Sequence, residues 1–178
     1  MPGWIVGTVG LSVVVATVAL FNVLVRARNL VRAGWADIDV QLQRRHDLIP
    51  QLVTAVKAYA DHERTTLEAV TRSRALAHAG GSISERGRRE DELAAGVARL
   101  LALRERYPDL EASGNFLQLQ HDLVEIEERL QQARRFYNGA VRDYNTRIGH
   151  FPALLIAAPL GFAPAEFFQA EARGVVQP

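Results

Sequence analysis

The sequence predicts an all-α fold in which an N-terminal transmembrane helix leads into a long antiparallel helical bundle. Two observations predict this fold class: the first 25 residues carry no charged side chain, and apolar residues recur about every 3.5 residues in the two longest segments that follow. The many Ala, Leu, Glu, Gln and Arg residues and the low aromatic content of 7% also favour helix. We expect a transmembrane anchor over residues 1–25, a helical bundle over 26–150, and an apolar, proline-rich C-terminal segment over 151–178.

The anchor is predicted from Trp4–Val25, a run of mostly apolar residues. At a rise of about 1.5 Å per residue this helix would be roughly 33 Å long, enough to cross a hydrocarbon core of about 30 Å. A cleaved signal peptide is the main alternative, but the run is too long and its first residues include no basic side chain. A buried core helix would need a larger protein around it, because the run is apolar on every face.

Three arginines follow the anchor before the first acidic residue, Asp37. Basic residues that flank a span stay on the cytoplasmic side, so we expect the N-terminus outside and the bundle in the cytoplasm. These arginines can also bind the headgroups of the lipid bilayer. The net charge of the whole chain is only +1, which argues against a nucleic-acid partner. These membrane-proximal basic residues are Arg26, Arg28 and Arg32.

Three glycines share one face of the anchor: Gly3, Gly7 and Gly10. Small residues at this spacing let transmembrane helices approach closely, although glycine is common in membrane helices in any case. We expect a homo-oligomer packed through the anchor and the membrane-proximal helix.

The first long helix after the anchor is predicted from a heptad seam, whose steps alternate between four and three residues. Pro50 lies within this seam and has no N–H to donate, so we expect a kink or break there, which makes the bundle resemble four helices. The seam consists of Val31, Trp35, Ile38, Leu42, Arg45, Ile49, Leu52, Val56, Tyr59, Glu63, Thr66 and Val70.

A loop over 78–82 precedes a shorter helix, and Ser82 with Glu85 forms a predicted capping box at its start. The third long helix follows a turn at 113–115. Because the loops are short, we expect neighbouring helices to pack antiparallel. The third helix has its own seam, which consists of Phe116, Leu119, Leu123, Ile126, Leu130, Ala133, Tyr137, Ala140 and Tyr144.

Arg45 and Glu63 occupy seam positions where apolar residues are expected. An unpaired buried charge is costly, so each must be paired, or the seam must open. The dipeptide Tyr-Asn occurs twice, seven residues apart, and its polar groups are suitable partners for Arg45 or the nearby aspartates. We favour a structural role that fixes helix register over a recognition or switch site. The candidate polar layer comprises Asp39, Arg45, Asp47, Tyr137, Asn138, Tyr144 and Asn145.

The segment from Phe151 onward contains three prolines, which exclude one continuous helix and leave two short helical turns as the expectation. We expect its large side chains to pack on the bundle or on a neighbouring protomer rather than to enter the bilayer. Three long helices that run alternately away from and towards the membrane would place Phe151 at the distal end. The predicted contact residues are Phe151, Phe162, Phe167 and Phe168.

Four stretches resemble the LemA family: RNLVRAGWADIDVQLQRRHDLIPQLVTAVKAYADHE (28–63), NFLQLQ (115–120), ARRFYNGAVRDYNTRIGHFP (133–152) and LIAAPLGFAPAEFFQAE (155–171). They occur in order over most of the chain. The resemblance implies a bacterial cytoplasmic-membrane protein with one N-terminal anchor and a cytoplasmic helical bundle. The family has no established biochemical activity, and its relation to the magnetosome protein MamQ implies a role in membrane organisation.

The sequence shows no catalytic or metal-binding motif. It has no cysteine for a thiolate nucleophile or a zinc site, and none of its five histidines follows a glutamate by three residues, as di-iron bundles require. We therefore expect no cofactor and no enzyme, but a scaffold or adaptor that self-associates or binds other membrane proteins. Two alternatives stay open: membrane remodelling through the C-terminal segment, and an unrecognised enzyme that uses Arg45, Asp47 and Tyr144.

Overall fold

The computed structural model describes residues 3–79 and 81–168, which form helices joined by turns and contain no strand. This confirms the all-α prediction. The α-helices are α1 (Gly3–Lys57), α2 (Arg64–His78), α3 (Ile83–Ala102), α4 (Pro108–Glu111), α5 (Gly114–Gly149) and α6 (Leu154–Ala157). Two short 3-10 turns, Asp61–Glu63 and Leu103–Glu105, precede α2 and α4.

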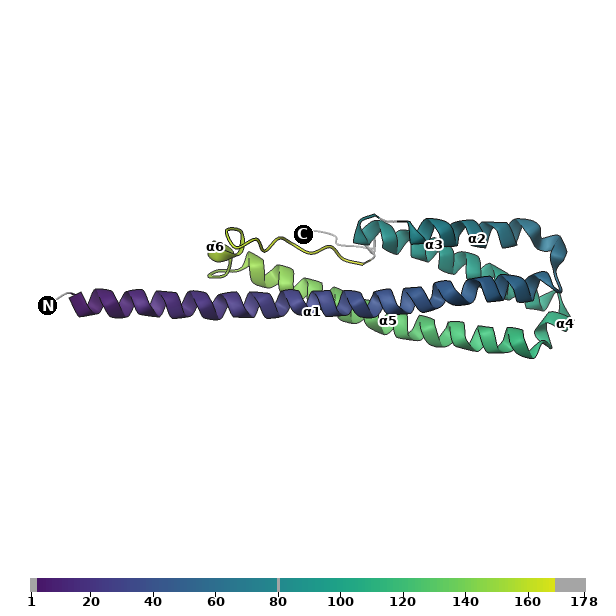
Figure 1. The fold of residues 1–178 in the computed structure, drawn as a ribbon, viewed down its shortest axis with the longest axis horizontal. Helices are drawn as coiled ribbons and strands as arrows, with labels where there is room; N and C mark the ends of the chain where they lie inside the picture. The colour runs from purple at the N-terminus through teal and green to yellow at the C-terminus, as the bar shows by residue number, and fades with distance from the viewer. Residues whose placement is uncertain (1–2, 80, 169–178) are drawn as a thin grey trace, which may run out of the picture.

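The 55-residue helix α1 runs the length of the molecule (Figure 1). Its N-terminal part extends beyond the bundle, and within the described residues α1 is the one helix long and apolar enough to cross a membrane. Helix α5 lies antiparallel along the second half of α1, while α2 and α3 form a hairpin at the end far from the N-terminus. The apolar segment therefore passes into the bundle as one helix.

The buried core has two parts along the bundle. The distal part joins α1 to α2, α3 and α5 around Leu52, Leu100 and Phe116. The part nearer the N-terminus joins α1, α5 and the C-terminal segment around Leu42 and Tyr137. The two long helices approach closely here, because a Cβ on Gly34 would lie 3.1 Å from the Tyr137 Cα.

Of the kink or break expected at Pro50, the break is wrong, since α1 continues through that residue to Lys57. A proline leaves the carbonyl four residues earlier without its helical donor. In this chain that carbonyl belongs to His46, and Arg74 Nε of α2 donates to it at 2.8 Å. A neighbouring helix thus replaces the missing hydrogen bond, and the chain turns only over residues 58–60.

This shift of the turn also overturns the expected position of Phe151. Helix α2 is a separate element that runs back along α1, α3 runs outward again, and α5 returns towards the N-terminal end (Figure 1). The C-terminal segment therefore starts beside the apolar part of α1 rather than at the distal end. The prediction counted three long helices instead of four, and it therefore placed the end of the last helix at the wrong end of the bundle.

Other local predictions are confirmed. Ser82 and Glu85 form the capping box at the start of α3: the Glu85 backbone N–H donates to Ser82 Oγ at 3.2 Å, and the Ser82 N–H donates to Glu85 Oε2 at 3.1 Å. The α5 seam is buried as predicted from Phe116 to Leu130 and again at Tyr137 and Tyr144. At the other two predicted positions, Ala133 and Ala140, the next residues, Arg134 and Val141, are more buried. The C-terminal segment covers this second flank of α5.

Candidate functional site

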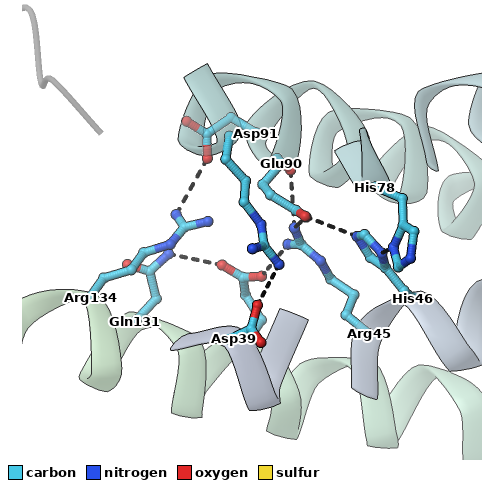
Figure 2. Close-up of polar contacts among 10 residues, drawn as sticks. Asp39, Arg45, His46, His78, Glu90, Asp91, Gln131 and Arg134 are labelled. Atoms are coloured by element: carbon cyan, nitrogen blue, oxygen red, sulfur yellow. Dashed lines mark hydrogen bonds and ion pairs between the residues drawn. The ribbon is translucent and has the colours of Figure 1, made fainter. Parts of the chain in front are cut away.

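An ionic cluster centred on two buried side chains connects α1, α3 and α5 (Figure 2). Arg45, from the α1 seam, is only 3% exposed, and its guanidinium pairs with the carboxylate of Glu90, which is fully buried on α3. Arg45 Nη2 also donates to the Glu90 carbonyl at 3.1 Å, and Nη1 lies 3.2 Å from Glu127 Oε2 of α5. The seam charge is therefore paired, as its burial requires.

His46 completes the surroundings of Glu90. Its Nε2 lies 2.9 Å from Glu90 Oε1, and its Nδ1 lies 3.3 Å from Nδ1 of His78 at the end of α2. Burial alone would raise the pKa of the Glu90 carboxyl, but the contact with His46 and the positive charge of Arg45 together hold this pKa below its ordinary value. Glu90 is thus an ionised group at the centre of the cluster.

Two further ion pairs, whose carboxylates are about half exposed, extend the cluster towards the surface. Arg86 Nη2 of α3 lies 2.6 Å from Asp39 Oδ1 of α1, and Arg134 Nη1 of α5 lies 3.3 Å from Asp91 Oδ1 of α3 (Figure 2). Each pair joins α3 to one of the two long helices. The ion pairs together fix the position of the α2–α3 hairpin on α1 and α5.

The predicted polar layer does not form one site, because its seven members fall into separate groups. Arg45 and Asp39 belong to the ionic cluster, whereas Asp47 is exposed and accepts a hydrogen bond from Gln43 on its own helix. The expectation that the Tyr-Asn residues pair with Arg45 or the aspartates is wrong. The combination of Arg45, Asp47 and Tyr144 proposed for an enzyme is not brought together.

The two Tyr-Asn dipeptides instead hold the C-terminal segment in an extended conformation along α5. The asparagines each make two hydrogen bonds to one backbone residue: Asn145 to Ala165 (2.9 and 2.8 Å) and Asn138 to Phe168 (3.0 Å each). The tyrosines donate to carbonyls, Tyr144 to Ala163 at 2.9 Å and Tyr137 to Glu166 at 2.7 Å. We call residues 163–168 with these four side chains the Tyr-Asn clamp.

Burial raises the pKa of both tyrosine hydroxyls in the clamp. Desolvation, with a contribution from the Glu166 carboxylate, raises the pKa of Tyr137 to about 12. Burial also raises the pKa of Tyr144, against the opposing charges of Arg28 and Arg32. Both hydroxyls therefore stay protonated at physiological pH and can donate to the backbone carbonyls.

Aromatic contacts anchor the clamped segment on α1. The Phe168 ring lies 5.7 Å from that of Trp35, and the Phe162 ring lies 5.8 Å from that of Phe21. The Arg28 guanidinium lies 4.8 Å from the Phe162 centroid, so this membrane-proximal arginine also stabilises the fold. Arg26 and Arg32 are exposed.

The four predicted C-terminal contact residues divide into two kinds. Phe162 and Phe168 are buried against the bundle as expected. Phe167 is 39% exposed and Phe151 is 80% exposed, so the bundle of the same chain does not cover them. Their packing on a neighbouring protomer, the other half of the expectation, stays a prediction. Over residues 151–168, the described part of this segment, the chain forms one short helix, α6, and an extended stretch rather than two helical turns.

The anchor glycines lie on an uncovered face. A Cβ on Gly3, Gly7 or Gly10 would meet nothing within 4 Å. The self-association predicted from them stays a prediction, because one chain is present.

Sequence reasoning did not identify Glu90, His46 or Glu127 as members of this cluster. One signal was available for Glu90: it precedes Leu93, Val97 and Leu100 at helical spacing, so the apolar stripe of α3 extends onto it. A charge on the stripe of one helix and a charge of opposite sign on the seam of another predict a buried pair.

Fold and site together define a class of protein: an all-α bundle continuous with an apolar helix of membrane-spanning length, closed by a clamped C-terminal segment. The chain belongs to the LemA family, whose family model matches residues 34–178. It is similar to the magnetosome protein MamQ 2 of Paramagnetospirillum magneticum, with 35% identity over 78 residues, or 44% of this chain and 29% of that protein. The magnetosome protein MamQ of Magnetospirillum gryphiswaldense is 28% identical over 78 residues, with the same coverage. The matching region thus spans less than a third of the length of these relatives.

Proposed function

We propose that this protein is a membrane-anchored helical scaffold or adaptor that associates with itself and with other membrane proteins. The observation that carries the proposal is the continuity of α1, which runs without a break from the apolar segment into the bundle core. A bundle joined to its anchor by one helix has a fixed direction relative to the bilayer. A bundle held in this way can present the same helix faces to every neighbouring protein in the membrane.

The uncovered surface of the anchor supports self-association. The glycine face is open, and large apolar side chains around it, such as Val6 and Leu11, are well exposed in the single chain. Lipid can cover these side chains, but the glycines permit close contact with a second helix. The proposed oligomer is packed through this face, with the bundle on the cytoplasmic side of a bacterial membrane.

A non-enzymatic role agrees with the chemistry of the described residues. The buried charges of the ionic cluster are engaged with one another and hold three helices together, and the clamp tyrosines donate to backbone carbonyls. These groups have a structural use that needs no substrate. The names of the MamQ relatives, as magnetosome proteins, support a role in membrane organisation.

Co-purification of two differently tagged full-length copies tests the proposal. Both copies are expressed in one cell, extracted in mild detergent, and captured through one tag. We expect the second tag in the eluate when the copies share a cell, and much less of it when separately prepared extracts are mixed. A clean monomer mass in detergent, with no crosslinking in native membranes, contradicts the proposal.

A further inference from the structure

Residues 151–160, which we call the α6 loop, lie beside the end of the apolar segment of α1 (Figure 1). Phe162, which follows the loop, contacts Phe21 with ring centroids 5.8 Å apart, and Leu24 is buried in the same cluster. Phe21 is only about 6 Å of helix before Val25, where the expected anchor ends. The α6 loop is therefore at the height where α1 leaves the bilayer.

The loop presents large apolar side chains outward. Phe151 is 80% exposed and Leu155 is 66% exposed, with Leu154 and Leu160 about half exposed. The inner side of the loop packs on the bundle, where Ala153 and Ala157 are buried. The residues that the structure describes leave these outer side chains largely uncovered, and a patch of this kind marks an interaction surface.

The charge distribution favours the bilayer over a protein as the surface that covers the patch. Residues 151–165 contain no charged side chain. Exposed basic residues lie at the same end of the molecule, on α1 at Arg26 and Arg32 and on α5 at Arg147, together with the acidic residue Asp143. An uncharged apolar loop beside basic side chains is suited to the headgroup and acyl boundary of an anionic membrane.

We propose that the α6 loop is a second membrane contact, in which Phe151, Leu154, Leu155 and Leu160 enter the leaflet from which α1 emerges. The proposal rests on the membrane anchor of the proposed function, because the bilayer around α1 is continuous with the surface that meets the loop. The Tyr-Asn clamp holds the segment that follows the loop, so the loop is kept at this height. Two contacts, rather than one helix alone, would then set the tilt of the bundle.

Spin-label accessibility on full-length protein in vesicles of phosphatidylcholine and phosphatidylglycerol tests this contact. The chain has no cysteine, so a single introduced cysteine carries the label. Leu155→Cys reports on the loop, Val14→Cys on the anchor, and Leu117→Cys on an exposed apolar position of α5 at the distal end. Oxygen collides with labels in lipid, whereas a water-soluble nickel chelate collides with labels in water.

We expect the label at position 155 to resemble the one at 14, with frequent oxygen collisions and several-fold fewer nickel collisions than at 117. Nickel accessibility at 155 equal to that at 117 overturns the proposal while leaving the anchor intact. Shielding from both reagents also overturns it, since it shows that a second copy or another protein covers the loop. If position 14 is itself open to nickel, the anchor and this inference fail together.

Discussion

Asn145 of α5 and Ala165 of the C-terminal segment exchange two hydrogen bonds, with the asparagine amide acting as donor and acceptor to one backbone residue. Asn138 repeats this arrangement with Phe168. Seven residues of helix span about 10.5 Å, and three residues of extended chain span about 10 Å. The spacing of the two asparagines therefore matches the spacing of the backbone groups that they hold, which gives the repeated Tyr-Asn dipeptide a physical reason.

Replacing Asn145 with Leu should release the clamped segment. The change keeps the side-chain size but leaves the Ala165 N–H and carbonyl without partners, at a cost of about 1–3 kcal/mol. Hydrogen exchange should become faster at the amides of Ala165 and Phe168. Asn115→Leu, at an exposed position of the same helix, is the matched control and should leave these amides protected. Unchanged protection in the Asn145 variant would show that aromatic packing alone holds the segment.

Removing Arg45 should strongly destabilise the bundle. Arg45→Met leaves the buried Glu90 carboxylate without its principal partner, so we expect a loss of about 3–5 kcal/mol in the free energy of unfolding. The double change Arg45→Met with Glu90→Leu should recover most of this loss, because neither charge remains. Arg129→Met breaks an exposed pair with Glu125 and should cost about 1 kcal/mol or less. Denaturant unfolding of detergent-solubilised protein measures the free energy of unfolding of these three variants. Equal losses for Arg45→Met and Arg129→Met would contradict the claim that the buried cluster stabilises the bundle.

Low pH should lower the free energy of unfolding of the wild type more than that of a Glu90→Gln variant. The folded-state pKa of Glu90 lies below its ordinary value of 4.5, so this carboxylate contributes stability that is complete above that value. The contribution is lost as the pH falls from 4.5 through the lower, folded-state pKa. The difference in unfolding free energy between wild type and Glu90→Gln should be constant at neutral pH and should shrink in acid below about pH 4.5. A difference that grows in acid would mean that the folded-state pKa is raised.

The arginines after the anchor should determine its orientation. A reporter that is active only in the cytoplasm, fused after Pro178, should be active in the wild type. Arg26→Asn with Arg32→Asn should give mixed orientation, while Arg28 is left in place because it stacks on Phe162. The same change at Arg129 and Arg135, which lie on the exposed face of α5, is the control and should have no effect. Activity of a reporter that works only outside the cytoplasm would contradict this orientation.

The sequence predicted the long helices well, because heptad spacing is a property of one segment and needs no partner. Features that depend on distant contacts were predicted poorly. The continuity at Pro50 depends on a donor from Arg74, and the partners of Asn138 and Asn145 are backbone atoms, which have no residue-type signature. The Arg45–Glu90 pair lies between these cases, since both residues occupy apolar stripes and could have been matched by charge.

Disulfide crosslinking in native membranes tests the proposed self-association most directly. Because the chain lacks cysteine, Gly7→Cys introduces a single thiol on the glycine face, where nothing within the chain obstructs it. Ser12→Cys places the thiol on the opposite face of the same helix, about 7.5 Å further along its axis. We predict a covalent dimer for Gly7→Cys under mild oxidation, and little or none for Ser12→Cys. No dimer from either variant, or equal amounts from both, would contradict a scaffold that associates through this face.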